Sequence, residues 1–132
     1  MGFITRTAAR SLLSGIFLYS GYRMVNNAEQ YARQASKALP LLPEEPMLAR
    51  AHGITMLVAG STFALGIFPK LSARILALTL ITNTYLGHQF WKLTPEERRP
   101  QLIHFLKNAG LFGGLLYVTS DRRSQQRDED SD

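Results

Sequence analysis

The sequence predicts an all-α fold, namely a transmembrane four-helix bundle with antiparallel up-down topology. Its 132 residues suit one domain, and only 19% of them are charged. Residues 51–69 and residues 75–91 contain no Asp, Glu, Lys or Arg. A membrane-spanning helix needs about 20 predominantly apolar residues, so both stretches are candidate spans. The mean hydropathy of −0.06 is typical of a soluble protein, but this average hides the segregation of charge.

Four apolar blocks are expected to form the spans: residues 7–22, 47–68, 71–91 and 100–120. At the 1.5 Å rise of a helix the last three reach about 30 Å and the first about 24 Å. Arg10 and Lys107 shorten the uncharged cores of the first and fourth blocks, which are supported chiefly by the two stronger spans between them. Residues 1–120 would then form the membrane domain. Residues 121–132 contain no apolar side chain and should be a disordered, charged tail.

The connections between the spans differ in kind. Asn26 or Asn27 could begin a short helix after the first span, either on the membrane surface or as a solvated loop helix. One face of that helix would carry Ala28, Tyr31, Ala35 and Leu39.

Prolines mark the two later connections. Only Pro69 and Lys70 separate the second and third spans, which predicts a tight antiparallel hairpin. Between the third and fourth spans, Thr94 and Pro95 predict one short helical turn that ends before Pro100.

Each block also carries small residues one helical turn apart, a spacing that lets helices approach closely in a membrane. The pairs are Ser11 and Gly15, Gly60 and Ala64, Ala73 and Ala77, and Gly110 and Gly114. Four such pairs in four blocks favour a closely packed helical bundle.

Polar residues within the spans concentrate toward one membrane face. With four antiparallel spans, His52, His88 and His104 all lie in terminal turns at that face. We hypothesise a polar pocket there that suits a quinone head group or a similar small ring. Its residues would be His52, Tyr85, His88, His104, Lys107 and Asn108. A structural interpretation, with interfacial histidines, a lysine that snorkels and hydrogen bonds between helices, is favoured roughly two to one, because polar residues commonly join membrane helices.

Other classes of site have less support in the sequence. The histidines lack metal-ligand spacing and an in-span carboxylate, so no metal ligand is assigned. We find no catalytic residue, because phosphate loops and nucleophile motifs are absent, and whether the protein is an enzyme stays open. The basic excess flanks apolar spans, which favours a lipid membrane rather than nucleic acid as the partner.

The order of motifs resembles the DoxX family of small four-span membrane proteins. Arg10 precedes LLSGIFLYSGYR, followed by GITMLVAGSTFALGIFPKLSARILAL, then HQFWKL, then HFLKNAGLFGGLLY. The family-like positions are Arg10, Gly21, Arg23, Lys107, Asn108 and Gly113. Many relatives carry an acidic residue in the second span, and this chain has none there.

The resemblance implies a multi-pass protein of the bacterial inner membrane. We expect an accessory or small subunit of a membrane redox or quinone-linked oxidative-stress system, with other subunits of that complex as partners. A small-molecule transporter, a structural scaffold that recruits partners and a soluble helical bundle are the alternatives. Positive charge is denser in the shorter segments on the side of the termini, which favours cytoplasmic termini.

Overall fold

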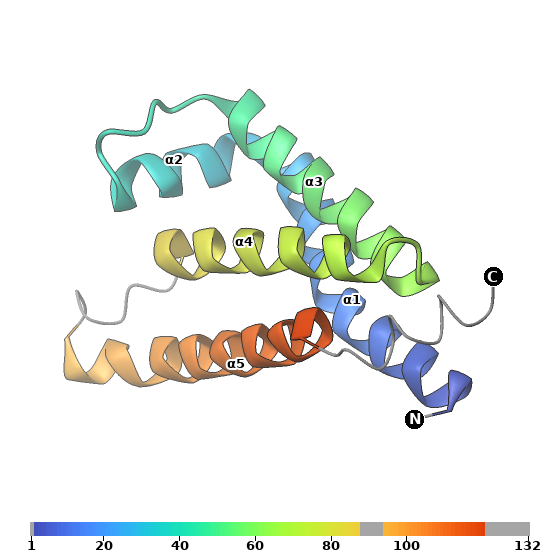
Figure 1. The fold of residues 1–132 in the computed structure, drawn as a ribbon. Coiled ribbons are helices and arrows are strands. Elements are labelled where there is room, and N and C mark those ends of the chain that lie inside the picture. Colours follow the sequence, from blue (N-terminus) through green and yellow to red (C-terminus); the bar gives the residue numbers. More distant parts are fainter. Residues whose placement is uncertain (1, 88–93, 121–132) are drawn as a thin grey trace.

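The computed structural model describes residues 2–87 and 94–120, and all of its regular structure in these ranges is helical. The helices are α1 (Phe3–Asn26), α2 (Ala28–Ala38), α3 (Pro46–Leu65), α4 (Pro69–Gly87) and α5 (Pro95–Ser120). The predicted all-α fold is therefore confirmed (Figure 1). The predicted tail and the last four residues of the third predicted span, His88 to Trp91, lie outside the described ranges.

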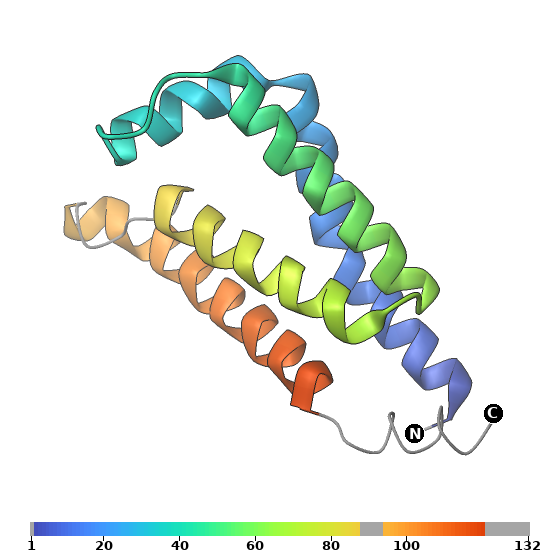
Figure 2. The same ribbon diagram turned by 45° about the horizontal axis from the view of Figure 1, so that its top comes forward.

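The four long helices form two antiparallel pairs. Helices α1 and α3 run side by side, as do α4 and α5, and the second pair is inclined to the first (Figures 1 and 2). The chain therefore alternates in direction through α1, α3, α4 and α5, as the up-down prediction requires. Helix α2 sits at one end, where it contacts both α3 and α4.

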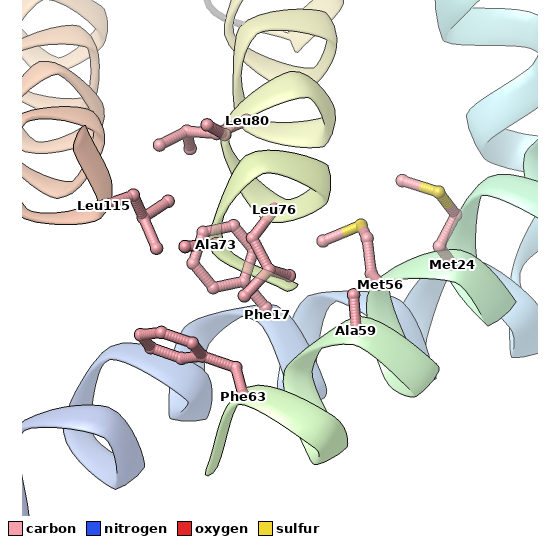
Figure 3. Close-up of a cluster of buried hydrophobic side chains, with 10 residues drawn as sticks. Phe17, Met24, Met56, Ala59, Phe63, Ala73, Leu76, Leu80 and Leu115 are labelled. Carbon is pink, nitrogen blue, oxygen red and sulfur yellow. The ribbon is translucent and has the colours of Figure 1, made fainter. Parts of the chain in front are cut away.

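One cluster of buried side chains joins the two pairs. Phe17 of α1, Met56 and Phe63 of α3, Leu76 of α4 and Leu115 of α5 are each at most 1% exposed and converge (Figure 3). Burying a side chain of this size stabilises the fold by about 1.5–3 kcal/mol. All four long helices thus depend on one shared core.

Two glycines make a close crossing between α1 and α3. A Cβ placed on Gly21 would lie 2.8 Å from the carbonyl oxygen of Gly53, and one on Gly53 would lie 2.9 Å from that of Gly21. Backbone therefore meets backbone between α1 and α3, which only residues without a side chain permit.

The small-residue pairs predicted from the sequence contribute unequally to the packing between helices. Ala73 and Ala77 are both buried, and Gly60 packs against Leu18. A Cβ on Gly15 would meet nothing within 4 Å. Spacing alone thus identified small residues but did not identify the Gly21–Gly53 crossing.

The predicted hairpin between the second and third spans is present. Gly66 ends α3 in the left-handed region with φ 77°, a conformation that glycine adopts readily. The hydroxyls of Thr62 and Ser72 are 2.7 Å apart and join the two helices across the turn. Helix α4 begins at Pro69, whose fixed φ suits the first helical position.

The predicted break before Pro100 is wrong, because α5 continues through this residue from Pro95 to Ser120. Pro100 lies six residues into the helix, where its missing N–H removes one bond to the carbonyl of Glu96. Its ring also favours helical φ. The first turn closes normally, with the Arg98 amide donating to the Thr94 carbonyl at 2.8 Å.

Helix α2 confirms the predicted short helix in the first long connection. Ala28 and Ala32 are buried and Tyr31 packs against the core, so the bundle covers its apolar face. Prolines follow α2, and Glu45 then caps α3 by accepting a hydrogen bond from the Met47 amide at 3.2 Å.

Large apolar side chains also cover much of the outer surface. Leu12 is 81% exposed, Leu78 65% and Tyr117 66%. Within residues 2–87 and 94–120, no helix combines the length and the apolar character that a membrane crossing requires. The four spans stay a prediction.

Candidate functional site

Two adjacent polar residues of α4 connect it to both neighbouring helices. Successive residues of a helix point about 100° apart, so Asn83 reaches α3 while Thr84 reaches α5. The Nε2 of His52 lies 2.9 Å from Oδ1 of Asn83. Since that carbonyl oxygen accepts, His52 donates from Nε2. The Asn83 amide in turn donates to the sulfur of Met56 at 3.4 Å.

On the α5 side, Thr84 pairs with Asn108. The Asn108 amide nitrogen donates to the Thr84 hydroxyl at 2.9 Å, and Asn108 is only 7% exposed. The pair lies in a groove of about 310 Å³ between α4 and α5. The groove is lined by Leu80, Ile81, Thr84, Tyr85, Phe105, Asn108, Ala109 and Phe112.

The groove combines apolar walls with a few polar groups. Phe105 and Phe112 provide aromatic surface, while Thr84, Tyr85 and Asn108 provide a hydroxyl, a phenol and an amide. The bond to Thr84 uses one N–H of the Asn108 amide, which has a second N–H and a carbonyl oxygen. Apolar walls with few polar groups are typical of sites that hold a small amphipathic ring.

The structure brings together two of the six predicted pocket residues, Tyr85 and Asn108. His52 pairs instead with Asn83 between α3 and α4. The side chains of His104 and Lys107 are exposed and do not line the groove. The sixth residue, His88, lies outside the described residues. Among the described residues, the two adjacent polar residues of α4 thus form two separate contacts, one with α3 and one with α5, and the six-residue pocket stays a prediction.

The register of α5 explains this difference. The residues that α5 turns toward the groove and the core are Phe105, Asn108, Phe112 and Leu115. Their spacing of three, four and three residues defines one row on the helix. Lys107 lies about 100° away from that row, which turns it outward. Phe105 and Phe112 were missed by the sequence analysis, and their spacing around Asn108 could have revealed them.

The other family-like positions have structural contacts of different kinds. Gly21 forms the helix crossing described above. The guanidinium carbon of Arg23 lies 6.0 Å from the centroid of the Tyr19 ring, the outer limit of a cation–π contact. A Cβ on Gly113 would meet nothing within 4 Å, whereas Arg10 lies against the turn between α3 and α4. Across the residues described, no three His, Cys, Asp or Glu side chains gather closely enough to hold a metal ion.

Comparisons with known proteins point in one direction. The model of the DoxX family matches residues 5–89, which span most of α1 and all of α2, α3 and α4. The chain is 28% identical over 112 residues to the inner membrane protein YphA of Escherichia coli (strain K12). That alignment covers 83% of this chain and 77% of YphA. No solved structure gives a significant match. The family match ends before α5, which forms one wall of the groove.

Proposed function

This chain belongs to the DoxX family, and on that premise we propose that it is an integral protein of the bacterial inner membrane. We further propose that it acts as an accessory subunit of a quinone-linked redox system and holds a quinone head group in the α4–α5 groove. The name of YphA supports the location, and the groove supports the ligand.

The distribution of side-chain size supports a lipid environment. Large apolar residues such as Leu12 and Leu78 are exposed, whereas Ala73 and Ser14 are fully buried. Soluble proteins rarely expose apolar surface on this scale. In lipid, small residues are enriched where helices meet.

We propose that both ends of the chain face the cytoplasm, as the charge distribution favours. The sequence contains no cysteine, so single cysteines can be placed without background. Glu29→Cys on α2 and Ser120→Cys at the end of α5 probe the two faces. A membrane-impermeant maleimide should label position 29 but not position 120 in intact spheroplasts, and both positions after lysis. Labelling of position 120 alone in intact spheroplasts would reverse the orientation, and equal labelling of both positions, or of neither, before lysis would contradict their placement on opposite sides of a membrane.

The Thr84–Asn108 pair within the groove carries the quinone proposal. The groove volume of about 310 Å³ suits one ring rather than a larger ligand. A quinone carbonyl oxygen accepts hydrogen bonds, and the second N–H of Asn108 can donate one. Phe105 and Phe112 would flank the ring with apolar surface.

The test compares substitutions of two adjacent residues of α5, namely Lys107, which is exposed, and Asn108, which lines the groove. We would measure the thermal stability of detergent-purified protein with and without a short-tail quinone. Since ligand binding stabilises the native state by mass action, a saturating quinone should raise the Tm by about 5 °C or more. Lys107→Leu should keep this shift because its side chain is exposed, whereas Asn108→Leu should abolish it.

Two outcomes would overturn this proposal. The first is no shift in the wild type, which would favour a scaffold that recruits partners. The second is loss of the shift in Lys107→Leu with retention in Asn108→Leu, which would place the ligand elsewhere. Thr84→Val removes the hydrogen-bond partner of Asn108 while preserving shape, so it provides a second groove variant if Asn108→Leu folds poorly.

A further inference from the structure

The guanidinium of Arg10 lies against the turn between α3 and α4, at the end of the molecule opposite α2. The Nη2 and Cζ atoms of Arg10 lie 3.0 and 3.2 Å from the position that a Cβ on Gly66 would occupy. The guanidinium therefore rests directly on the turn, in space that a side chain at Gly66 would fill. The Nε of Arg10 is buried and has no hydrogen-bond partner among the described residues.

A second unpartnered polar atom lies one helical turn further along α1. Ser14 is 0% exposed, and its Oγ has no hydrogen-bond partner in the described part of the chain. Seven other helical hydroxyls donate to a carbonyl three or four residues earlier, namely those of Thr7, Thr55, Thr62, Thr79, Thr82, Thr119 and Ser120. Leaving a buried polar group without a partner costs about 1–3 kcal/mol. Arg10 and Ser14 share a helix face, so both missing partners are on the same side of α1.

Among the residues that the structure describes, the charges around Arg10 have one sign. Arg6 lies one turn before it on α1, and Lys70 and Arg74 lie in the first turns of α4 at the same end. The acidic residues of the described chain lie on α2, immediately before α3 or in the first turn of α5, at the other end: Glu29, Glu44, Glu45, Glu96 and Glu97. The C-terminal carbonyls of α3 offset part of the charge of Arg10. They leave its Nε–H without an acceptor.

We propose that Arg10 and Ser14 bind a phosphate-class oxyanion, supplied by an anionic lipid head group or by free phosphate. A guanidinium presents a planar fork that matches a phosphate, and the Ser14 hydroxyl adds a second donor. Arg10 is itself partly exposed, so a phosphate can approach it from the surface while Nε and Ser14 lie beneath. Arg6 and Lys70 add positive potential at the same end.

The depth of the site within the proposed membrane domain is consistent with a lipid source. Arg10 lies in the first turn of the first predicted span, at the level of the head groups, where basic pockets between helices bind lipid phosphates. The site lies at the end opposite the His52–Asn83 contact, so it is independent of the quinone proposal. Only its lipid source depends on the proposed membrane location.

Thermal unfolding of detergent-purified protein tests this site with two probes. One is inorganic phosphate against chloride at constant ionic strength, and the other is short-chain phosphatidylglycerol against a diacylglycerol of equal chain length, which lacks the phosphate. A probe that binds should raise the Tm of the wild type by about 5 °C in a saturable manner. A response to phosphatidylglycerol alone would identify the lipid as the source, and a response to both would identify the phosphate group as sufficient.

Three variants separate binding from structural effects. Arg10→Lys keeps the charge that the α3 terminus favours but loses the guanidinium fork, so it should lose at least half of the shift. Ser14→Ala should also reduce the shift, although its Tm without ligand should not fall because its hydroxyl has no partner. Arg33→Lys, an exposed residue on α2, should keep the full shift. No shift with either probe, or Arg10→Lys equal to wild type, would overturn the proposal and leave Arg10 as a cap of α3.

Discussion

Replacing a glycine by alanine should destabilise the protein at the crossing of α1 and α3 and stabilise it at an open position of the same helix pair. In Gly53→Ala the new Cβ would lie 2.9 Å from the carbonyl oxygen of Gly21, 3.0 Å from Cγ2 of Val25 and 3.1 Å from Cβ of Met24. The nearest atom belongs to the backbone, so the helices themselves must separate. A Cβ atom essentially never lies within 3.0 Å of a heavy atom on another helix.

Two opposing effects set the size of the change. Overpacking of this kind costs about 1–3 kcal/mol. Replacing glycine by alanine in a helix returns about 0.8–1 kcal/mol through lower backbone entropy in the unfolded chain. The net loss for Gly53→Ala is therefore about 0–2 kcal/mol, and its midpoint of about 1 kcal/mol corresponds to a fall in Tm of about 4 °C for a domain of this size.

Gly15→Ala is the matched control, because it lies on α1 and its Cβ would meet nothing within 4 Å. At Gly15 the substitution gains helix propensity without any steric cost, so we expect a rise in Tm of about 3 °C. Thermal unfolding followed by far-UV circular dichroism measures both variants against wild type in the same detergent. Equal Tm changes for the two variants, or a higher Tm for Gly53→Ala, would refute the close crossing.

Three other substitutions test separate parts of the fold by thermal unfolding. Leu115→Ala should lower the free energy of unfolding by about 2–5 kcal/mol, because the Leu115 side chain is fully buried. Leu116→Ala should change it by no more than about 0.5 kcal/mol, because Leu116 is 46% exposed. Equal losses for the two variants would contradict the register of α5. Asn83→Ala should cost about 1–2 kcal/mol because it removes the partner of the half-buried His52 ring, and an unchanged Tm would argue against that bond. Gly66→Ala should cost about 1–2 kcal/mol because its φ is 77°, and Gly66→Asn should recover part of the loss if the left-handed turn is correct.

Sequence patterns were sufficient to predict which segments are helical and where the chain reverses. Long apolar blocks between polar, proline-containing connections predicted the four long helices, and Pro69 with Lys70 predicted the tight turn. These features depend on local chemistry, because a proline or a run of apolar residues acts on its own neighbourhood. The merged α5 is the exception, since Pro100 near a helix start is tolerated where one further in would not be.

Which face of each helix meets its neighbour became known only from the packed arrangement of the helices. Neighbouring residues on a helix point about 100° apart, so a small change in the facing row exchanges an inward residue for an outward one. Asn108 therefore lines the groove, whereas the adjacent Lys107, which the sequence hypothesis placed in the same pocket, is exposed. The Gly21–Gly53 crossing could not be predicted for the same reason, because the spacing of residues within one helix does not show which residues of another helix they will contact. Contacts between helices depend on the shapes of both surfaces, which sequence periodicity in one helix does not specify.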